Sequence, residues 1–297
     1  MKPKKVGLCY FSGTGNTWAI AREYADGFAR LGHEVDVLRM EALLRGGPMG
    51  ALAHYDFLGL GYPVHAWGAP FLVEDFLRAL PASQHQNVFL FLTLGGSFGG
   101  AFEEARRILG NKGYIIVHEA VYYTGCDYYV SPKARSLTAA EMEEQLAWCS
   151  IDAHEAAEEI LEGIDRHFFA SALERIVLTD IGHRLYLRGA RELYRLFRAD
   201  ARCDHCGLCV RTCPTGNIRL GEHGVIFGRR GTLCLRCLGI CPKGAIQVGR
   251  WTEKIGRYLA PGYGQALVRE ILFARDAEAL QDAEERPEPE MGDAPPA

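Results

Sequence analysis

Seven of the ten cysteines in this 297-residue chain fall between Cys203 and Cys241. Cysteines in such number form a disulfide framework or serve in metal binding or catalysis, and a reducing compartment favours the last two. The apolar run from Val6 to Tyr10 is too short for a signal-peptide core, and no later apolar run approaches the ~20 residues of a membrane span. We therefore expect a cytoplasmic protein with no integral membrane segment, whose thiols stay reduced and bind metal.

The first cysteine run reads Cys203-x2-Cys206-x2-Cys209-x3-Cys213, followed by Pro214. In bacterial ferredoxins three thiolates of such a run hold one iron–sulfur cubane and the fourth reaches the other cluster. Zinc is the alternative, but structural zinc sites usually draw on two separated cysteine pairs. The spacing therefore predicts an iron–sulfur domain.

The second run has one ligand fewer. It contains Cys234, Cys237 and Cys241, followed by Pro242, and Gly231 stands where the first cysteine belongs. If the ferredoxin pairing holds, one [4Fe-4S] cluster is completed by Cys203, Cys206, Cys209 and Cys241. Three thiolates then remain for the second, from Cys213, Cys234 and Cys237. Three thiolates can support a [3Fe-4S] cluster, a [4Fe-4S] cubane with a non-protein, histidine or carboxylate ligand, or a site that stays empty.

The N-terminal part, residues 1–163, alternates short apolar runs with amphipathic stretches. This pattern is typical of a parallel sheet with helices on both faces. We expect five strands, at Val6–Tyr10, Glu34–Met40, Asp56–Gly61, Val88–Leu94 and Tyr114–Tyr122, and a closing helix over Glu141–Leu161. The predicted class is a doubly wound α/β domain, followed by a small α+β iron–sulfur domain at 200–249.

A glycine- and hydroxyl-rich loop follows the first predicted strand and opens the first helix. Its residues are Ser12, Gly13, Thr14, Gly15, Asn16 and Thr17. Backbone N–H groups at a helix N-terminus, small residues and hydroxyls together suit a phosphate group. The loop lacks the lysine of a P-loop and the G-x-G-x-x-G spacing of dinucleotide sites. The alternative is a glycine-rich turn that only caps the helix.

The segment Tyr10–Thr17 resembles the FMN-phosphate loop of flavodoxins, and the repeated Cys-Pro-x-x-x-Ile pattern is similar to two-cluster ferredoxins. From about residue 5 to 249 the chain resembles the flavodoxin-ferredoxin fusion electron-transfer proteins of bacteria and archaea. The resemblance implies a flavodoxin-like domain that binds FMN. The backbone amides of residues 13–17 and the hydroxyls of Ser12, Thr14 and Thr17 would hold the phosphate.

Two further loops follow the third and fourth strands. In flavodoxins the equivalent loops sandwich the flavin ring, often with a stacked aromatic side chain. The resemblance implies contacts from Tyr62, Pro63, His65, Trp67, Gly68, Gly95, Gly96, Phe98 and Gly99. Trp67, Tyr62 and Phe98 are the aromatic candidates, although each would serve equally as packing. Tyr62 and His65 are candidate proton donors, and His65 is otherwise an ordinary loop histidine.

Residues 164–199 are helical in pattern and rich in arginine. They predict either a linker helix, with a packed apolar stripe and solvated arginines, or a docking face for an acidic redox partner or an anionic membrane. Residues 250–297 predict a helix over Gln265–Ala277 and a disordered acidic tail. Of the other cysteines, Cys9 and Cys149 are expected to be buried hydrophobes, whereas Cys126 could reach a cofactor.

These features favour an electron carrier over an enzyme. FMN exchanges one or two electrons and a cubane exchanges one, so a single chain could relay electrons between them. One alternative is an FMN-dependent reductase of a quinone or other small acceptor, fed by the clusters. Another is a redox-sensing interaction module. We expect an unidentified redox partner protein and no nucleic acid, since a net charge of −4 gives no strong single-sign field.

Overall fold

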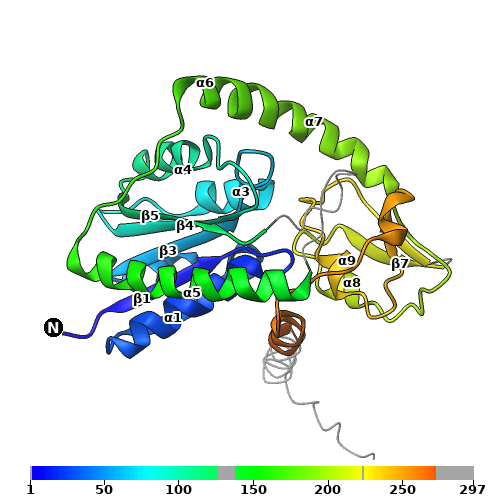
Figure 1. The fold of residues 1–297 in the computed structure, drawn as a ribbon, viewed down its shortest axis with the longest axis horizontal. Helices are drawn as coiled ribbons and strands as arrows, with labels where there is room; N and C mark the ends of the chain where they lie inside the picture. The colour runs from blue at the N-terminus through cyan, green and yellow to red at the C-terminus, as the bar shows by residue number, and fades with distance from the viewer. Residues whose placement is uncertain (1, 126–137, 223, 272–297) are drawn as a thin grey trace, which may run out of the picture.

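The computed structural model describes residues 2–125, 138–222 and 224–271, so Cys126, the acidic tail and the end of the predicted C-terminal helix lie outside it. The chain forms a large α/β domain and a small cysteine-rich domain, joined by a long helical segment (Figure 1). None of the helices in the described ranges is long and apolar enough to cross a membrane.

The large domain is built on a five-stranded parallel sheet of order β2-β1-β3-β4-β5. The strands are β1 Lys5–Tyr10, β2 Glu34–Arg39, β3 Phe57–Pro63, β4 Asn87–Leu94 and β5 Ile115–Tyr123. This is the flavodoxin order, and it reverses direction between β1 and β3, the point at which such sheets bind ligands. The predicted fold class and the five strands are confirmed.

Helices cover both faces of the sheet and enclose two cores (Figure 1). On one face α1 (Asn16–Arg30) packs against α5 (Ala139–Glu162), with Tyr24, Phe28 and Phe89 buried between helices and sheet. The other face carries α2 (Met40–Leu44), the 3₁₀ turn η1 (Met49–His54), α3 (Phe71–Ala79) and α4 (Ala101–Gly110). Cys9 and Cys149 are buried among these apolar residues, as expected.

The small domain contains two short antiparallel pairs and two short helices. Its elements are β6 (Phe197–Ala199), α8 (Leu208–Arg211), β7 (Ile218–Gly221), β8 (Gly224–Phe227), α9 (Arg236–Ile240), β9 (Ile246–Val248) and the 3₁₀ turn η4 (Trp251–Lys254). Strand β6 pairs with β9, and β7 pairs with β8. The chain then returns to the large domain, where residues 263–271 are helical.

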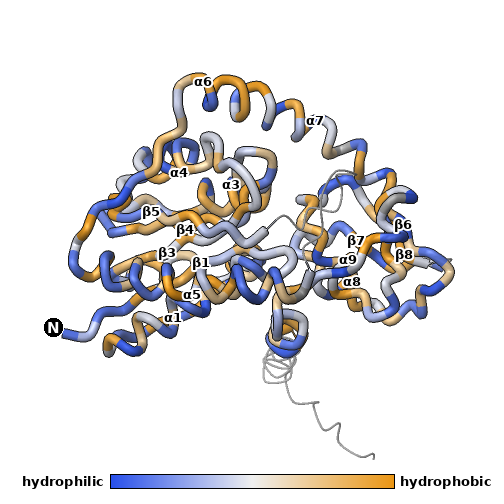
Figure 2. Tube along the Cα trace, in the orientation of Figure 1, coloured by the Kyte–Doolittle hydropathy of each residue, from blue (hydrophilic) through white to orange (hydrophobic). Residues whose placement is uncertain are grey.

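A single helical segment, here called the strap helix, links the domains. It runs through α6 (Ala172–Glu174), a π-helical stretch η2 (Arg175–His183), α7 (Arg184–Leu193) and the 3₁₀ turn η3 (Tyr194–Leu196) (Figure 1, top). Its C-terminal part packs Ala190 and Tyr194 against Leu233 of the small domain, whereas its first part leaves apolar residues exposed. Ile176, Ile181 and Leu185 are each about half exposed, and the hydrophobic colour along this segment is plain in Figure 2.

Candidate cofactor sites

A cavity of about 250 Å³ lies at the carboxyl ends of β1, β3 and β4. It is lined by ten of the residues expected to bind FMN: Ser12, Gly13, Thr14, Asn16, Thr17, Pro63, His65, Trp67, Gly95 and Gly96. The other lining residues were not foreseen: Val64, Ala66, Thr93, Leu94, Ser97, Thr124, Gly125, Leu233, Cys234 and Leu235. The last three belong to the small domain, so both domains build the cavity.

The loop before α1 has the backbone of an anion site. Gly15 has φ 108°, a conformation that glycine adopts at little cost, and its N–H donates to Ser12 Oγ at 3.0 Å. The N-cap residue of α1 is Gly15, which makes no side-chain capping bond, and the first N–H groups of a helix have no partner within the helix itself. The Thr17 and Thr93 hydroxyls lie 2.8 Å apart. These donors fit the phosphate group of FMN.

The loop after β3 is a tight two-residue turn in a strained conformation. His65 N–H donates to Gly68 O at 2.9 Å, and between them Ala66 and Trp67 have φ 45° and 68°. Positive φ costs a non-glycine residue about 1–2 kcal/mol, and strain of this kind gathers at functional sites. The turn orients Trp67 at the cavity wall.

The strap helix holds this turn in place from outside. Thr179 Oγ1 accepts from Gly100 N–H at 2.6 Å and donates to Trp67 O at 3.3 Å. The imidazole Nδ1 of His183 lies 2.9 Å from Ala66 O. The strap therefore stabilises both loops that were expected to flank the flavin ring.

Two of the aromatic candidates lie away from the cavity. Tyr62 is fully buried and its hydroxyl donates to Ala101 O at 3.3 Å. Phe98 packs edge-on against Phe102 and Phe168. Neither lines the cavity, and the same holds for Gly15, Gly68 and Gly99. Trp67 is the one of the three aromatic candidates that does.

His65 is neutral at physiological pH. Burial, and then the neighbouring His183, lower its pKa to about 4, while a hydrogen bond with the backbone of Thr232 opposes the shift. This bond joins the flavin-side loop to the second cysteine run. A neutral imidazole is a poor proton donor, so His65 is better suited to holding the two loops together.

The second cysteine run packs directly on the phosphate loop. A Cβ atom on Gly13 would lie 2.0 Å from Cys234 O, so the two backbones are in contact and position 13 accepts glycine alone. Cys234 and its neighbours Leu233 and Leu235 line the cavity. A cysteine expected to bind iron therefore lies at the wall of the expected flavin site.

A buried ion pair fixes this contact. Arg236 stands between two cysteines of the second run and is 1% exposed. Its guanidinium donates to Glu41 Oε1 at 2.7 Å, to Ser12 O at 2.7 Å and to Thr212 O at 2.9 Å. Tyr263 OH also donates to Ser12 O, at 2.7 Å. The outer side of the phosphate loop is thus held by the C-terminal part of the chain.

The two cysteine runs repeat each other's backbone. Their cysteines correspond at an offset of 28 residues (234 − 206, 237 − 209 and 241 − 213). The left-handed residues follow the same offset, with His205 and Gly207 matching Leu233 and Leu235. So do two N–H···S bonds, Asn217 N to Cys213 Sγ at 3.2 Å and Ala245 N to Cys241 Sγ at 3.3 Å. The pseudo-repeat therefore extends to the hydrogen bonds of the ligand sulfurs.

The thiols fall into two groups. Burial raises the pKa of Cys209 to about 11, and its thiol neighbours Cys241, Cys206 and Cys203 add to the rise. Burial also raises the pKa of Cys237, and the thiols of Cys234, Cys213 and then Cys209 add to the rise. The two largest thiol contributions at Cys237 thus come from the cysteines that the expected pairing groups with it.

The spacing of the thiols does not suit a single zinc ion. A tetrahedral zinc with bonds of about 2.3 Å holds its sulfurs about 3.8 Å apart. Of the ligand-type atoms in the described residues, one trio lies mutually within 4.8 Å, and it contains no cysteine. The sulfurs are thus too widely spaced for one zinc ion.

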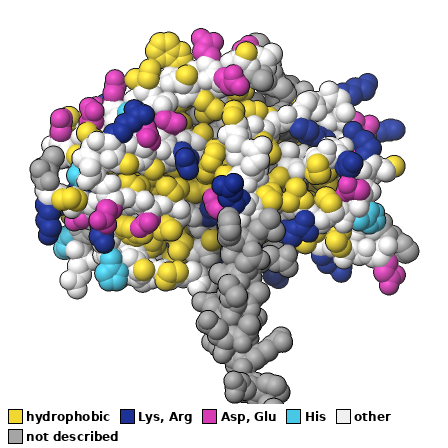
Figure 3. All heavy atoms as spheres, turned by 90° about the horizontal axis from the view of Figure 1, so that it is seen from below, with side chains coloured by type: hydrophobic (Ala, Val, Ile, Leu, Met, Phe, Trp, Pro, Cys, Tyr) yellow, Lys and Arg dark blue, Asp and Glu magenta, His cyan; other side chains and the backbone are white. Residues whose placement is uncertain are grey.

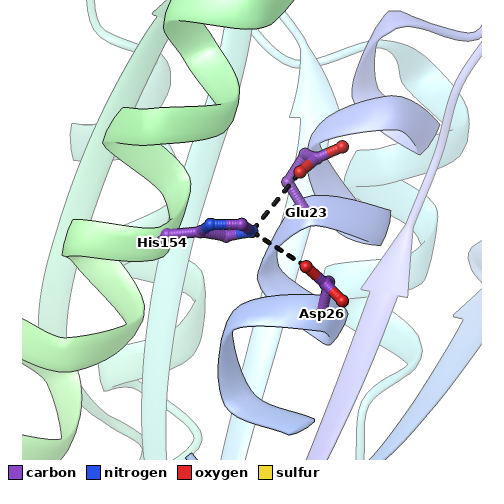
Figure 4. A group of neighbouring side chains, drawn as sticks. All are labelled: Glu23, Asp26 and His154. Atoms are coloured by element: carbon purple, nitrogen blue, oxygen red, sulfur yellow. Dashed lines mark ion pairs between the residues drawn. The ribbon is translucent and has the colours of Figure 1, made fainter. Parts of the chain in front are cut away.

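That trio, Glu23, Asp26 and His154, joins α1 to α5 (Figure 4). His154 Nε2 lies 3.4 Å from a carboxylate oxygen of each acidic residue. Arg30 pairs with Asp26 at 2.7 Å, and Ser150 donates to Glu23 at 2.5 Å. The carboxylates thus have partners within the protein, and the group acts as an ion-pair contact between two helices.

The fold and the site define a flavodoxin-like α/β domain combined with an iron–sulfur domain. Residues 202–245 match the family described as "4Fe-4S dicluster domain". The comparison with curated proteins returned no match.

Among solved structures, the chain is similar to a flavodoxin from the domain Archaea, with 19% identity, a TM-score of 0.38, and coverage of 53% of this chain and 99% of that one. It is also similar to Flavodoxin 2 from Bacillus cereus, with 23% identity, a TM-score of 0.39, and coverage of 52% and 99%. Rubredoxin oxygen:oxidoreductase from Desulfovibrio gigas is 21% identical with a TM-score of 0.37, and the match covers 54% of this chain and 38% of that one.

Proposed function

We propose that the chain transfers electrons internally between iron–sulfur clusters and FMN and acts as a redox carrier. The observation that carries this proposal is the position of Cys234, which lines the cavity beside Gly13. When bound, FMN supplies one- or two-electron chemistry and each cluster supplies one-electron chemistry. The protein's part is to hold the second cysteine run against the phosphate loop through Arg236 and against the loop after β3 through His65.

The ligand sets are those of the ferredoxin pairing, supported by the thiols that raise the pKa of Cys209 and Cys237. One [4Fe-4S] cluster is held by Cys203, Cys206, Cys209 and Cys241, here called the distal cluster. The other site, here called the proximal site, is formed by Cys213, Cys234 and Cys237. FMN is held by the phosphate loop, Ser12 to Thr17, and by the loops that carry Trp67 and Gly96. Electrons enter or leave through the distal cluster.

The surface of the small domain supports entry at that end. Cys206 is exposed, whereas Cys209 is buried. Among the described residues of 200–249, six basic residues are exposed against two acidic ones: Arg202, Arg211, Arg219, Arg229, Arg230 and Lys243 against Asp204 and Glu222. On the face drawn in Figure 3, basic side chains gather at the right, over this domain. A partner with an acidic surface fits this charge.

The test is anaerobic photoreduction with absorbance recorded at both flavin and cluster wavelengths. In the wild-type protein the flavin should become reduced together with the clusters. A Cys237→Ala variant should keep FMN and the distal cluster but reduce its flavin far more slowly. Equal flavin reduction in both proteins, or clusters that stay reduced beside an oxidised flavin, would refute the relay. Multiple turnovers of a quinone would favour the reductase alternative.

A further inference from the structure

Gly231 occupies the position of a missing ligand. The 28-residue offset that relates the other cysteines pairs Cys203 with position 231 (203 + 28). A Cβ atom at Gly231 would lie 2.8 Å from Cε1 of Tyr194 and 3.1 Å from Nδ2 of Asn217. The ring of Tyr194 therefore fills the space that a cysteine side chain would need.

The backbone around Gly231 is held in this arrangement from two sides. Tyr194 donates its hydroxyl to Gly231 O. Asn217 accepts from Arg230 N–H at 2.7 Å and donates to Gly228 O at 3.2 Å, and its own N–H donates to Cys213 Sγ. The loop that lacks a ligand and one that carries a ligand are thus joined through one asparagine.

The space between these residues offers no substitute ligand of the usual kind. Its lining contains the thiols of Cys213, Cys234 and Cys237, and its other polar side chains are Tyr194, Thr215, Asn217 and Thr232. Neither a carboxylate nor an imidazole is among these described lining residues. Tyr194, Thr232 and Leu233 are each at most 5% exposed. A small-molecule ligand therefore has little access to the fourth corner, the position that the fourth iron of a [4Fe-4S] cubane would occupy.

We propose that the proximal site holds a three-iron [3Fe-4S] cluster, with three cysteine ligands and the ring of Tyr194 closing the fourth corner. The inference deepens the proposed function, because it names the type of the cluster that faces the flavin. It depends on the two thiol groups holding clusters at all. It does not depend on electron transfer to FMN.

The first test is iron and sulfide analysis with low-temperature EPR on wild-type protein purified without oxygen. We expect about seven irons per chain, three plus four, and an EPR signal already present before reduction. The iron content should stay near seven after reconstitution with excess iron and sulfide. About eight irons with an EPR-silent oxidised state, or about four irons, would overturn the proposal.

The Tyr194→Phe variant distinguishes a side chain that only fills the space of the missing ligand from one that binds iron. In Tyr194→Phe the ring remains and the hydroxyl is lost, so we expect the EPR signal and iron content to be unchanged. If the phenol oxygen bound iron instead, this variant would lose iron or change its spectrum, and the proposal would fail. The Tyr194→Phe result is informative even if larger changes unfold the domain.

The missing ligand can also be restored. Gly231→Cys alone should keep about seven irons, because Tyr194 blocks the new side chain. Gly231→Cys combined with Tyr194→Ala should gain a fourth iron at this site and lose the oxidised-state signal, with Tyr194→Ala alone as its control. If Gly231→Cys alone restored a full cubane, Tyr194 would not be closing the corner. Photoreduction of the flavin is recorded separately, so a failed relay and a wrong cluster type are distinguishable.

Discussion

The backbone of Gly13 and the backbone of Cys234 are in contact, so that a Cβ atom on Gly13 would lie 2.0 Å from Cys234 O. Residue 13 belongs to the phosphate loop and residue 234 to the second cysteine run, 221 residues further along the chain (234 − 13). This contact brings the expected flavin and iron sites together. Because the two backbones touch, a substitution as small as Gly13→Ala tests this contact.

We expect Gly13→Ala to force the two loops apart. A methyl group this close to backbone atoms cannot be accommodated by rotating a side chain, and overpacking of this kind costs about 1–3 kcal/mol. The variant should unfold at lower denaturant concentration and retain less FMN on gel filtration. Gly110→Ala is the control, because nothing lies within 4 Å of its added Cβ. Equal FMN retention in both variants would contradict the contact.

Arg236 is expected to stabilise the docking of the small domain. Arg236→Met leaves the Glu41 carboxylate buried with Arg39 at 3.8 Å as its remaining ion-pair partner. Removing one partner of a buried pair costs about 3–5 kcal/mol, and removing both is far less costly. We therefore expect a loss of about 3 kcal/mol in the free energy of unfolding and partial recovery in Arg236→Met/Glu41→Met.

Denaturant titration of wild type, Arg236→Met, Glu41→Met and the double variant measures this coupling as a double-mutant cycle. Arg202→Met is the control, because Arg202 pairs with Asp200 at the surface. Exposed pairs contribute about 0–1 kcal/mol, so this variant should remain close to wild type. Similar losses in Arg202→Met and Arg236→Met would show that the buried pair has no special role.

Local sequence signals predicted the parts of the fold that local chemistry decides. The loop from Ser12 to Thr17 could be recognised because glycine spacing, hydroxyls and a following helix lie within one short segment. The cysteine spacing was informative for the same reason. By contrast, the burial of Arg236 depends on Glu41, which is 195 residues away. An arginine between two cysteines gives no local sign that it will be buried.

The prediction for Tyr62 depended on where β3 ends. A strand that stops at Gly61 leaves Tyr62 in a loop, free to reach the flavin. The strand continues to Pro63, and alternation along it places Leu58, Leu60 and Tyr62 on the same face. Tyr62 therefore points into the core under α3 and α4. Because β3 ends two residues later than predicted, the side chain of Tyr62 lies in the core and not in a loop beside the flavin site.

The strap helix illustrates a different difficulty. Its inward residues Thr179, Gly182 and His183 are small or polar because they face the backbone of two loops rather than an apolar core. The larger apolar residues of its first half, such as Ile176, Ile181 and Leu185, are left exposed, whereas Tyr194 near its end is buried. Helical periodicity correctly indicates a helix here, but in the first half it assigns the wrong face to the interior.

Thr179→Val should weaken FMN binding without disturbing the phosphate loop. The substitution keeps the shape of the side chain but leaves Gly100 N–H and Trp67 O without this partner. Loss of such bonds costs about 1–3 kcal/mol, equivalent to roughly a tenfold or greater rise in Kd. Flavin fluorescence titration gives the Kd. Leu173→Ala, 72% exposed on the same helix, should bind FMN like wild type.

The low pKa of His65 predicts a pH dependence of stability. Its pKa is about 4 in the folded chain and 6.5 in the unfolded chain, so the unfolded chain binds the proton more readily. The contribution of neutral His65 is fully present above about pH 6.5 and falls as the pH decreases toward 4. Between pH 8 and 5 we expect a loss of at most about 2 kcal/mol, since one pKa unit corresponds to about 1.36 kcal/mol.

The measurement compares the free energy of unfolding of wild type and His65→Asn across this range. Asparagine does not titrate, so the difference between the two curves isolates His65 from every other group that titrates in both proteins. Wild type should lose stability relative to the variant as the pH falls below 6.5. Parallel curves from pH 8 to 5 would mean that His65 takes up a proton in the folded protein as readily as in the unfolded chain. The bond to the backbone of Thr232, which favours the protonated ring, would then balance the effects of burial and of His183.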